Sequence, residues 1–270
     1  MRTGEHVFSD GHPLIQTPVA ESAVRWSKGA GKLTFRLMSP APPLRLDPRR
    51  VAVALAAVVL SLVALHLLAM QIIFNDGLGL SDVLGLEYWH LSTLDLDEEE
   101  SFGTWFSSGM LFFACLLLLR ARTARLAAEP GAIGWLVLGL GFCFLSLDEV
   151  VALHELMNSL LGDTPWTAVA IPFAALLGLC FVPFLRSLDG ATAIRFLVAG
   201  AVYVGGAVGV EHVTDEAVNS LHYNMWTALE EGVEMFGVIL FIHALLDLQR
   251  GGVIRLEIGA PQPSASPQSP

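Results

Sequence analysis

Apolar residues are grouped along the chain into six blocks separated by shorter polar segments. Each block is close to the roughly twenty residues that an α-helix needs to cross a hydrocarbon core about 30 Å thick. The six predicted spans are Val51–Phe74, Phe102–Leu119, Ile133–His154, Trp166–Leu185, Phe196–Thr214 and Met225–Leu246. The pattern predicts an all-α, polytopic membrane protein built as a bundle of six transmembrane helices.

The composition supports this class. The chain is 54% hydrophobic and 15% charged, and its mean hydropathy is +0.60, whereas a soluble domain carries about 25% charged residues. Cys115, Cys143 and Cys180 all fall inside predicted spans and form no CxxC motif. We therefore expect small apolar core side chains there, and neither a disulfide framework nor a zinc site.

The two ends of the chain differ from the bundle at 51–250. Residues 1–50 hold scattered Pro and Gly and eight of the basic residues, which predicts a mostly disordered cytoplasmic tail. Met38 is a second possible start of translation within this tail. Residues 251–270 are of low complexity and predict a flexible tail. The first apolar block, Val51–Phe74, is longer than a typical signal-peptide core and no cleavage pattern follows it, so we expect it to stay attached.

The basic residues predict the orientation. All 15 Lys and Arg lie before the first span, after the sixth, or beside the loops that follow the second and fourth spans. By the positive-inside rule both termini are cytoplasmic, in an inner or plasma membrane whose lipids are the immediate partners. Eighteen of the 26 acidic residues lie in the outer loops or in the span ends that face them. The net charge of −11 gives no support to nucleic-acid binding.

Acidic and histidine side chains recur at one depth inside the predicted spans. Counting about 1.5 Å per helical residue from the cytoplasmic ends places His66, Asp148, Glu211 and Glu234 in one layer, in the outer third of the hydrocarbon core. The candidate site residues at or near this layer are Asp148, Glu149, His154, Glu155, Glu211, His212, Glu230, Glu231 and Glu234. We expect them to face a cavity that opens to the outer side.

Within each span the candidates share a face at 100° per residue. The three glutamates of the sixth span occupy one 100° arc, and Glu211, His212 and Asp215 repeat that arc on the fifth span. Asp148 and Glu155 are seven residues apart and fall on one line of the third span. Spans three, five and six therefore form the predicted pocket, with contributions from spans one and two.

The charge balance of the layer predicts its ligand class. Isolated charges in lipid cost several kcal/mol, and the layer contains no Lys or Arg, so its carboxylates either share protons or bind a cation. The leading hypothesis is a divalent metal, Zn, Fe or Mn, because these ions accept mixed carboxylate and imidazole ligands. The expected main ligands are Asp148, Glu155, Glu211, His212 and Glu234, supported by Glu149, His154, Glu230 and Glu231.

Catalysis is left open by the sequence. A metal with an open coordination position could activate water for hydrolysis of a lipid or another amphiphile. However, no HExxH motif is present, and the one Glu-x-x-His pair, Glu87 and His90, falls in an outer loop. Two alternatives remain: a proton- or cation-coupled transporter, or a non-catalytic membrane scaffold whose acids are solvated at the boundary. Ser146 is the one serine that we retain as a weak candidate nucleophile.

Overall fold

The computed structural model describes residues 46–77, 79–125, 132–161, 167–210, 212 and 220–249. All regular secondary structure in these residues is helical, as predicted. Apart from residues 46–50, the two predicted terminal tails lie outside the described residues, and so does Met38.

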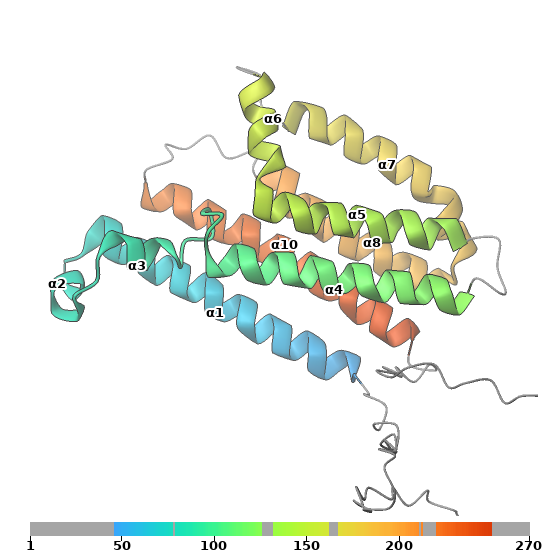
Figure 1. Ribbon diagram of the computed structural model, residues 1–270, viewed down its shortest axis with the longest axis horizontal. Coiled ribbons are helices and arrows are strands. Elements are labelled where there is room, and N and C mark those ends of the chain that lie inside the picture. Colours follow the sequence, from blue (N-terminus) through green and yellow to red (C-terminus); the bar gives the residue numbers. More distant parts are fainter. Residues whose placement is uncertain are drawn as a thin grey trace, which may run out of the picture. The chain divides into compact units, whose positions relative to one another are not determined.

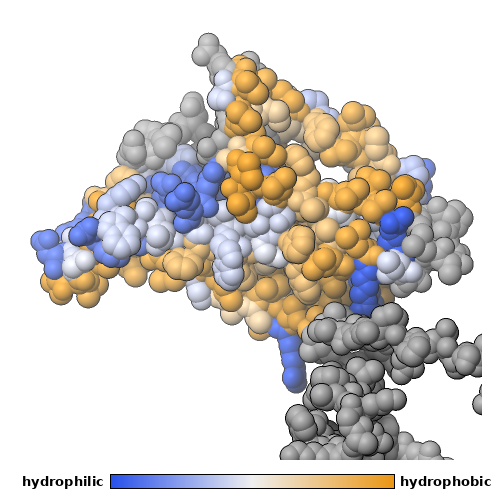
Figure 2. All heavy atoms as spheres, in the orientation of Figure 1, coloured by the Kyte–Doolittle hydropathy of each residue, from blue (hydrophilic) through white to orange (hydrophobic). Residues whose placement is uncertain are grey.

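Five helical segments are long and apolar enough to cross a membrane, which is the behaviour expected of a helical membrane protein (Figure 1). These segments belong to α1 (Pro48–Asn75), α4 (Phe102–Arg125), α5 (Ala132–Val151), α7 (Thr167–Ser187) and α8 (Gly190–Val204) with its π-helical continuation η1 (Gly205–Val210). Their positions agree with the first five apolar blocks. The prolines of α7, Pro172 and Pro183, lie inside a continuous helix. Figure 2 shows hydrophobic residues spread over α5 and α7, as lipid-facing flanks require.

A sixth long helix, α10 (Leu221–Leu248), packs against α1, α4, α8 and η1. The Ser220 hydroxyl caps its first turn by accepting a hydrogen bond from the Tyr223 N–H at 3.0 Å. Its buried residues include Met235, Val238 and Ile242. Because most of the other long helices touch it, α10 is the central helix of the bundle (Figure 1).

The loop between α1 and α4 contains two short helices, α2 (Leu80–Leu84) and α3 (Tyr88–Ser92). Asp76 caps α2 by accepting hydrogen bonds from the Leu80 N–H at 2.7 Å and from the Ser81 N–H and hydroxyl. The bonds from Ser81 are the main reason that the pKa of Asp76 lies below its ordinary value. Asp76, one of the acids of this loop, therefore serves as a helix cap.

The predicted start of the fifth span was too late. Helix α8 begins at Gly190 rather than Phe196, because Asp189 caps it by accepting a hydrogen bond from the Thr192 N–H at 3.0 Å. Arg195, expected to flank a loop, lies inside α8 and forms an ion pair with Asp247 of α10 at 2.5 Å. The hydropathy pattern missed the first turns of α8 because they contain the charged Arg195.

The predicted end of the third span was also wrong. Helix α5 stops at Val151, and α6 (Leu153–Leu161) is a separate helix. Between them Ala152 adopts the left-handed conformation with φ of 53°, which is rare for a residue with a Cβ. The Ala152 N–H closes the last turn of α5 on the Asp148 carbonyl at 2.7 Å. Asp148 and Glu155 therefore do not share one line of a continuous helix.

Large aromatic rings fill the contact between α5 and the α8–α10 pair at one end of the bundle. Trp135 of α5 is 1% exposed and stands edge-on to Phe196 of α8, with ring centroids 6.0 Å apart. Phe196 lies 4.5 Å from Phe241 of α10, and Phe142 of α5 stacks on Phe241 at 4.7 Å. We call Trp135, Phe142, Phe196 and Phe241 the aromatic cluster.

Candidate functional site

Tyr203, in the last turn of α8, has four of the predicted site residues near it. Its hydroxyl lies within electrostatic range of four carboxylates, those of Glu234 and Glu231 on α10 and of Asp148 and Glu149 on α5. All five side chains are half-buried. The structure thus gathers acids from the predicted third and sixth spans around a phenol that the sequence analysis missed. We call Asp148, Glu149, Glu231, Glu234 and Tyr203 the acidic cluster.

Two glycines allow the close helix contact that forms this cluster. Gly206 of η1 lies against α10: a Cβ added there would fall 2.7 Å from Glu234 Cγ and 2.9 Å from the Glu230 carbonyl oxygen. Gly237 of α10 lies against the backbone of Tyr203, where an added Cβ would be 2.6 Å from the Tyr203 nitrogen. Small residues that let backbones approach are typical of membrane helix pairs. These two contacts position Tyr203 beside Glu234.

The segment after Tyr203 is π-helical over Gly205–Val210. Such turns are rare and occur often at functional sites. Glu211, which follows η1, lies outside the described residues, as does Asp215, so their predicted arc with His212 stays a prediction. The exposed His212 contacts the start of α7, with its Nδ1 3.2 Å from the hydroxyl oxygen of the buried Thr167.

The remaining candidates have different surroundings. His154 and Glu155 are residues of α6, beyond the break at Ala152, and their side chains lie outside the described part of the chain. Glu230 is half-buried on α10, with its carbonyl oxygen against Gly206.

His66, which the sequence places at the depth of the acidic layer, is a fully buried connector. Its Nε2 lies 3.0 Å from the Asn224 carbonyl oxygen of α10, and its Nδ1 accepts a hydrogen bond from the Leu96 N–H at 3.0 Å. Asp95 Oδ1 is 3.3 Å from the same Nδ1. The bonds with Asn224 and Leu96 place the ring proton on Nε2, with Nδ1 as the acceptor. His66 therefore ties α1 to α10 and to the loop before α4.

Glu87 and His90, the Glu-x-x-His pair of the loop between α1 and α4, form the N-terminal cap of α3. The Glu87 N–H donates to His90 Nδ1 at 3.0 Å, and the Trp89 indole N–H donates to Glu87 Oε2 at 2.7 Å. The Glu87 side chain in turn accepts from the His90 backbone N–H, which completes the reciprocal arrangement of a capping box. Its geometry explains the spacing without a metal.

Ser146 makes interhelical contacts in the structure. Its hydroxyl donates to the Ser108 carbonyl oxygen at 3.0 Å, and the Ser108 hydroxyl donates back to the Ser146 carbonyl oxygen at 2.8 Å. These reciprocal bonds join α4 to α5. They assign Ser146 a structural role.

Among the described residues, no group of three or more His, Cys, Asp or Glu side chains lies close enough together to hold a metal ion. Glu211 and the side chains of His154 and Glu155 lie outside the described part of the chain. The acidic cluster is a set of carboxylates around a phenol, and it can exchange protons or attract a cation.

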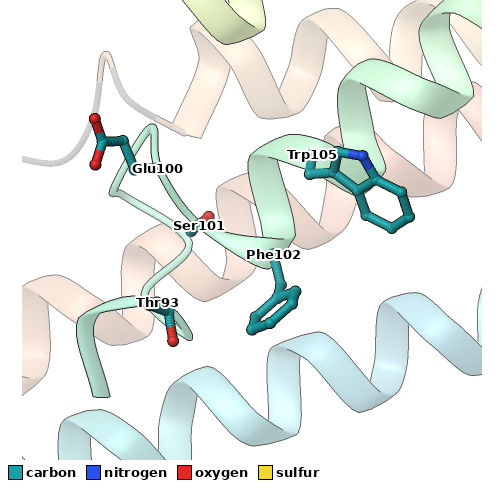
Figure 3. Close-up of a pocket in the computed structure, with 5 residues that line it drawn as sticks. All are labelled: Thr93, Glu100, Ser101, Phe102 and Trp105. Carbon is teal, nitrogen blue, oxygen red and sulfur yellow. The ribbon is translucent and has the colours of Figure 1, made fainter. Parts of the chain in front are cut away.

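An open hollow of about 330 Å³ lies at the start of α4 and is lined by Thr93, Glu100, Ser101, Phe102 and Trp105. Figure 3 shows Glu100 and Trp105 pointing in different directions, so the lining side chains do not converge on one point. Phe102 and Trp105 are exposed, as aromatic residues at a membrane boundary commonly are. The hollow suits lipid contact better than catalysis.

The all-helical bundle, its five membrane-crossing helices and the acidic cluster among them define a helical membrane protein. Residues 51–248 match the family described as "Domain of unknown function (DUF8692)", and the chain belongs to this family. The matched region ends at the last residue of α10, so the family corresponds to the helical bundle. No curated protein and no solved structure matches the chain.

Proposed function

We propose that this is a six-span protein of the inner or plasma membrane whose acidic cluster binds a divalent cation, Zn, Fe or Mn, from the outer side. The observation that carries the proposal is that four carboxylates from α5 and α10 lie within electrostatic range of Tyr203. Carboxylates contributed by facing helices are how bundle cores bind metal ions.

Helix α10 is the sixth span in this proposal. Its 28 residues give about 42 Å of helix at 1.5 Å per residue, enough to cross a bilayer core. The acids of its first half kept its hydropathy low, while its C-terminal half is apolar up to Asp247. With six spans and the alternating basic residues, both termini are cytoplasmic.

Glu234 and Asp148 are the proposed central ligands, with Glu231 and Glu149 beside them. Further donors come from the segments that flank the cluster: Glu155, His154, Glu211, His212 and Glu230. If the bound ion keeps one open position, it can lower the pKa of a coordinated water and support hydrolysis of a lipid-like substrate.

Elemental analysis by ICP mass spectrometry of the detergent-purified protein tests this proposal. Wild type, Glu234→Gln and Asp148→Asn are compared with Asp82→Asn, an exposed acid of α2, as the matched control. We expect near-stoichiometric metal in the wild type and in Asp82→Asn, and loss in the other two variants. Absence of metal from the wild type, after incubation with each ion, would overturn the proposal.

A second candidate function is proton- or cation-coupled transport, and the position of the Tyr203 hydroxyl supports it. A phenol among carboxylates can donate and accept protons, so the cluster has the chemistry of a relay. Proteoliposomes carrying a pH-sensitive dye test this: flux in the wild type and its loss in Tyr203→Phe would favour transport. Metal-dependent hydrolysis without flux would favour the enzyme, and neither metal nor flux would favour a scaffold.

A further inference from the structure

Helix α6 has an apolar side that is exposed. At 100° per residue its apolar residues fall within an arc of about 140°; they are Leu153, Leu156, Met157, Leu160 and Leu161. The other residues of α6 are polar and fall on the opposite side of the helix. Leu156 is 55% exposed, Met157 42% and Leu160 77%. Within the described part of the chain α6 packs mainly against α5, so this apolar side is left uncovered.

Helix α6 does not continue the axis of α5. The left-handed residue Ala152 separates the two helices, and its carbonyl oxygen accepts the first backbone bond of α6, from the Leu156 N–H at 3.1 Å. Figure 1 shows α6 running at a steep angle to α5. Because α5 is one of the helices long and apolar enough to cross a membrane, a helix at a steep angle to α5 runs along the membrane plane.

The packing of α4 on α5 gives the level at which α6 begins. The reciprocal hydrogen bonds between Ser108 and Ser146 put these two residues side by side on antiparallel helices. Phe102 lies six residues before Ser108 and Ala152 six residues after Ser146, so both are about 9 Å from that contact in the same direction. Phe102 and Trp105 are exposed directly after the acidic end of the α1–α4 loop, as aromatic residues at a lipid–water boundary are. Ala152 therefore lies at the level of this boundary.

We propose that α6 lies along the lipid–water boundary on the side of the α1–α4 loop, with its apolar side among the acyl chains. The bilayer is the occupant because the apolar side continues the exposed surface of α5, where Val150 and Val151 are 55% and 52% exposed. Figure 2 shows hydrophobic residues along α6 and at its junction with α5. Helices of this kind lie in the membrane plane with the apolar face about 5–10 Å below the head groups.

The charge of α6 decides which lipids bind it. The helix contains no Lys or Arg, whereas helices that select anionic lipids carry these residues on the polar face. Burial of apolar area therefore holds α6 in the boundary, and zwitterionic phospholipids suffice.

The position of α6 also determines the depth of the acidic cluster. Asp148 and Glu149 precede Ala152 by four and three residues, which is about 6 and 4.5 Å along α5. These carboxylates lie about one helical turn below the boundary, within reach of the head-group region. The placement of α6 does not depend on the proposed cation binding, because it rests on the apolar side of α6 and on the α4–α5 register.

Spin labelling of the full chain in phosphatidylcholine nanodiscs tests the proposal. Single nitroxides are attached to Leu160→Cys and to Ser159→Cys, on the apolar and polar sides of α6, with the native Cys115, Cys143 and Cys180 replaced by Ala. We expect the Leu160→Cys label to collide more with lipid-soluble oxygen than with a water-soluble nickel chelate. The ratio should reverse at Ser159→Cys, and both results should be the same when anionic phosphatidylglycerol is added.

A reference label at Leu176→Cys on α7, a position 58% exposed in a membrane-crossing helix, should lie deeper than the Leu160→Cys label. Equal depth at the two positions would overturn the proposal, because α6 would then enter the hydrocarbon core. Equal nickel access at Leu160→Cys and Ser159→Cys would overturn it too, because α6 would then lie in water. Strong spin–spin broadening at Leu160→Cys would mean that a second copy covers the apolar side, which also contradicts the proposal.

Photolabelling of the wild-type protein tests the same placement without any substitution. Phosphatidylcholine carrying a diazirine near the ester carbonyl should label Met157 or Leu160 of α6, as mapped by peptide mass spectrometry. A diazirine at the end of the acyl chain should label α7 near Leu176 and leave α6 unlabelled. Labelling of α6 by the deep probe alone, or by neither probe, would overturn the proposal.

Discussion

Side chains of α5 meet those of α8 and α10 in two places, and the two contacts differ in chemistry. In the aromatic cluster, Trp135, Phe196 and Phe241 pack ring against ring and are buried. In the acidic cluster, Tyr203 faces carboxylates that are all half-buried. The same three helices supply both.

The aromatic cluster stabilises the packing of the helices, whereas the acidic cluster is the proposed binding site. In lipid, helix association depends on close packing, because the hydrocarbon is as apolar as the side chains. The buried rings of the aromatic cluster make many dispersion contacts and so stabilise this packing. Carboxylates at a half-buried position pack less well and carry a desolvation penalty. The proposed ligand or proton binding would account for a cluster of them between tightly packed helices.

The largest expected effect comes from Gly237→Val, which should damage both clusters together. The new side chain would overlap the Tyr203 backbone, since a Cβ alone would lie 2.6 Å from its nitrogen. We expect a loss of about 3 kcal/mol or more in the free energy of unfolding, with Gly237→Ala intermediate. Thermal unfolding in detergent measures it. Gly200→Ala on α8, with open space around it, is the control, and a wild-type melting curve for Gly237→Val would contradict the close approach.

Trp135→Ala should damage the aromatic cluster alone. Removing a ring that is 1% exposed leaves a cavity against Phe196, and the expected loss is about 3 kcal/mol. Any cation bound by the acidic cluster should be retained in the fraction that stays folded. Trp105→Ala, where the ring is 74% exposed, should change stability by less than about 0.5 kcal/mol. Equal losses of stability in the two variants would mean that burial of the Trp135 ring does not contribute to the free energy of unfolding.

Glu234→Gln should keep the stability of the protein and lose binding, which is the reverse of the result expected for Trp135→Ala. The amide keeps the shape and hydrogen-bonding capacity of the side chain, so we expect stability within about 1 kcal/mol of wild type, while cation or proton binding is lost. Parallel measurement of melting and of binding checks this. A destabilisation as large as that of Trp135→Ala would assign the acidic cluster a structural role.

Ala152 determines where α5 ends, three residues after Glu149, and its backbone can be tested by substitution. A left-handed conformation costs a residue with a Cβ about 1–2 kcal/mol, and a β-branched residue fits it worst. The order of stability should be Ala152→Gly at or above wild type and Ala152→Val below it by about 1–2 kcal/mol. If Ala152→Val is as stable as wild type, α5 and α6 must form one continuous helix.

The smallest effect concerns Asp189, at the end of the bundle that holds the aromatic cluster. Hydrogen bonds from Thr192 hold the pKa of Asp189 below its ordinary value of 3.8, so the ionised cap stabilises the fold above about pH 4. That contribution is lost as the pH falls through the lowered pKa. Asp189→Ala should lower the melting temperature slightly at pH 7 and less at pH 3. A difference that grows toward acid would contradict this sign.

Much of the fold followed from local sequence. Insertion into lipid depends on the apolar content of about twenty consecutive residues, so the five crossing helices could be located within a few residues. The boundaries failed where a local signal was absent or misleading: Ala152 breaks a helix without Gly or Pro, and Arg195 is a charge inside α8.

The candidate site stays a prediction. The sequence singled out Asp148, Glu149, Glu231 and Glu234 because acids in a predicted span are rare, and these four are the carboxylates near Tyr203. Tyr203 was missed, although Gly206 and Gly237 were the available signal of a close helix contact beside it. His66 was singled out by its predicted depth, but its role as a connector required the positions of Asn224 and Leu96.

The sequence by itself determined the class of protein and most of its helices, because hydropathy and helical periodicity act along one segment at a time. Only the tertiary structure decided which groups lie near one another, such as Tyr203 and the carboxylates or His66 and the Asn224 carbonyl oxygen. The physical reason is that such contacts depend on how each helix is rotated and crossed against its neighbours. Small residues and packing determine that rotation, and hydropathy carries no record of it.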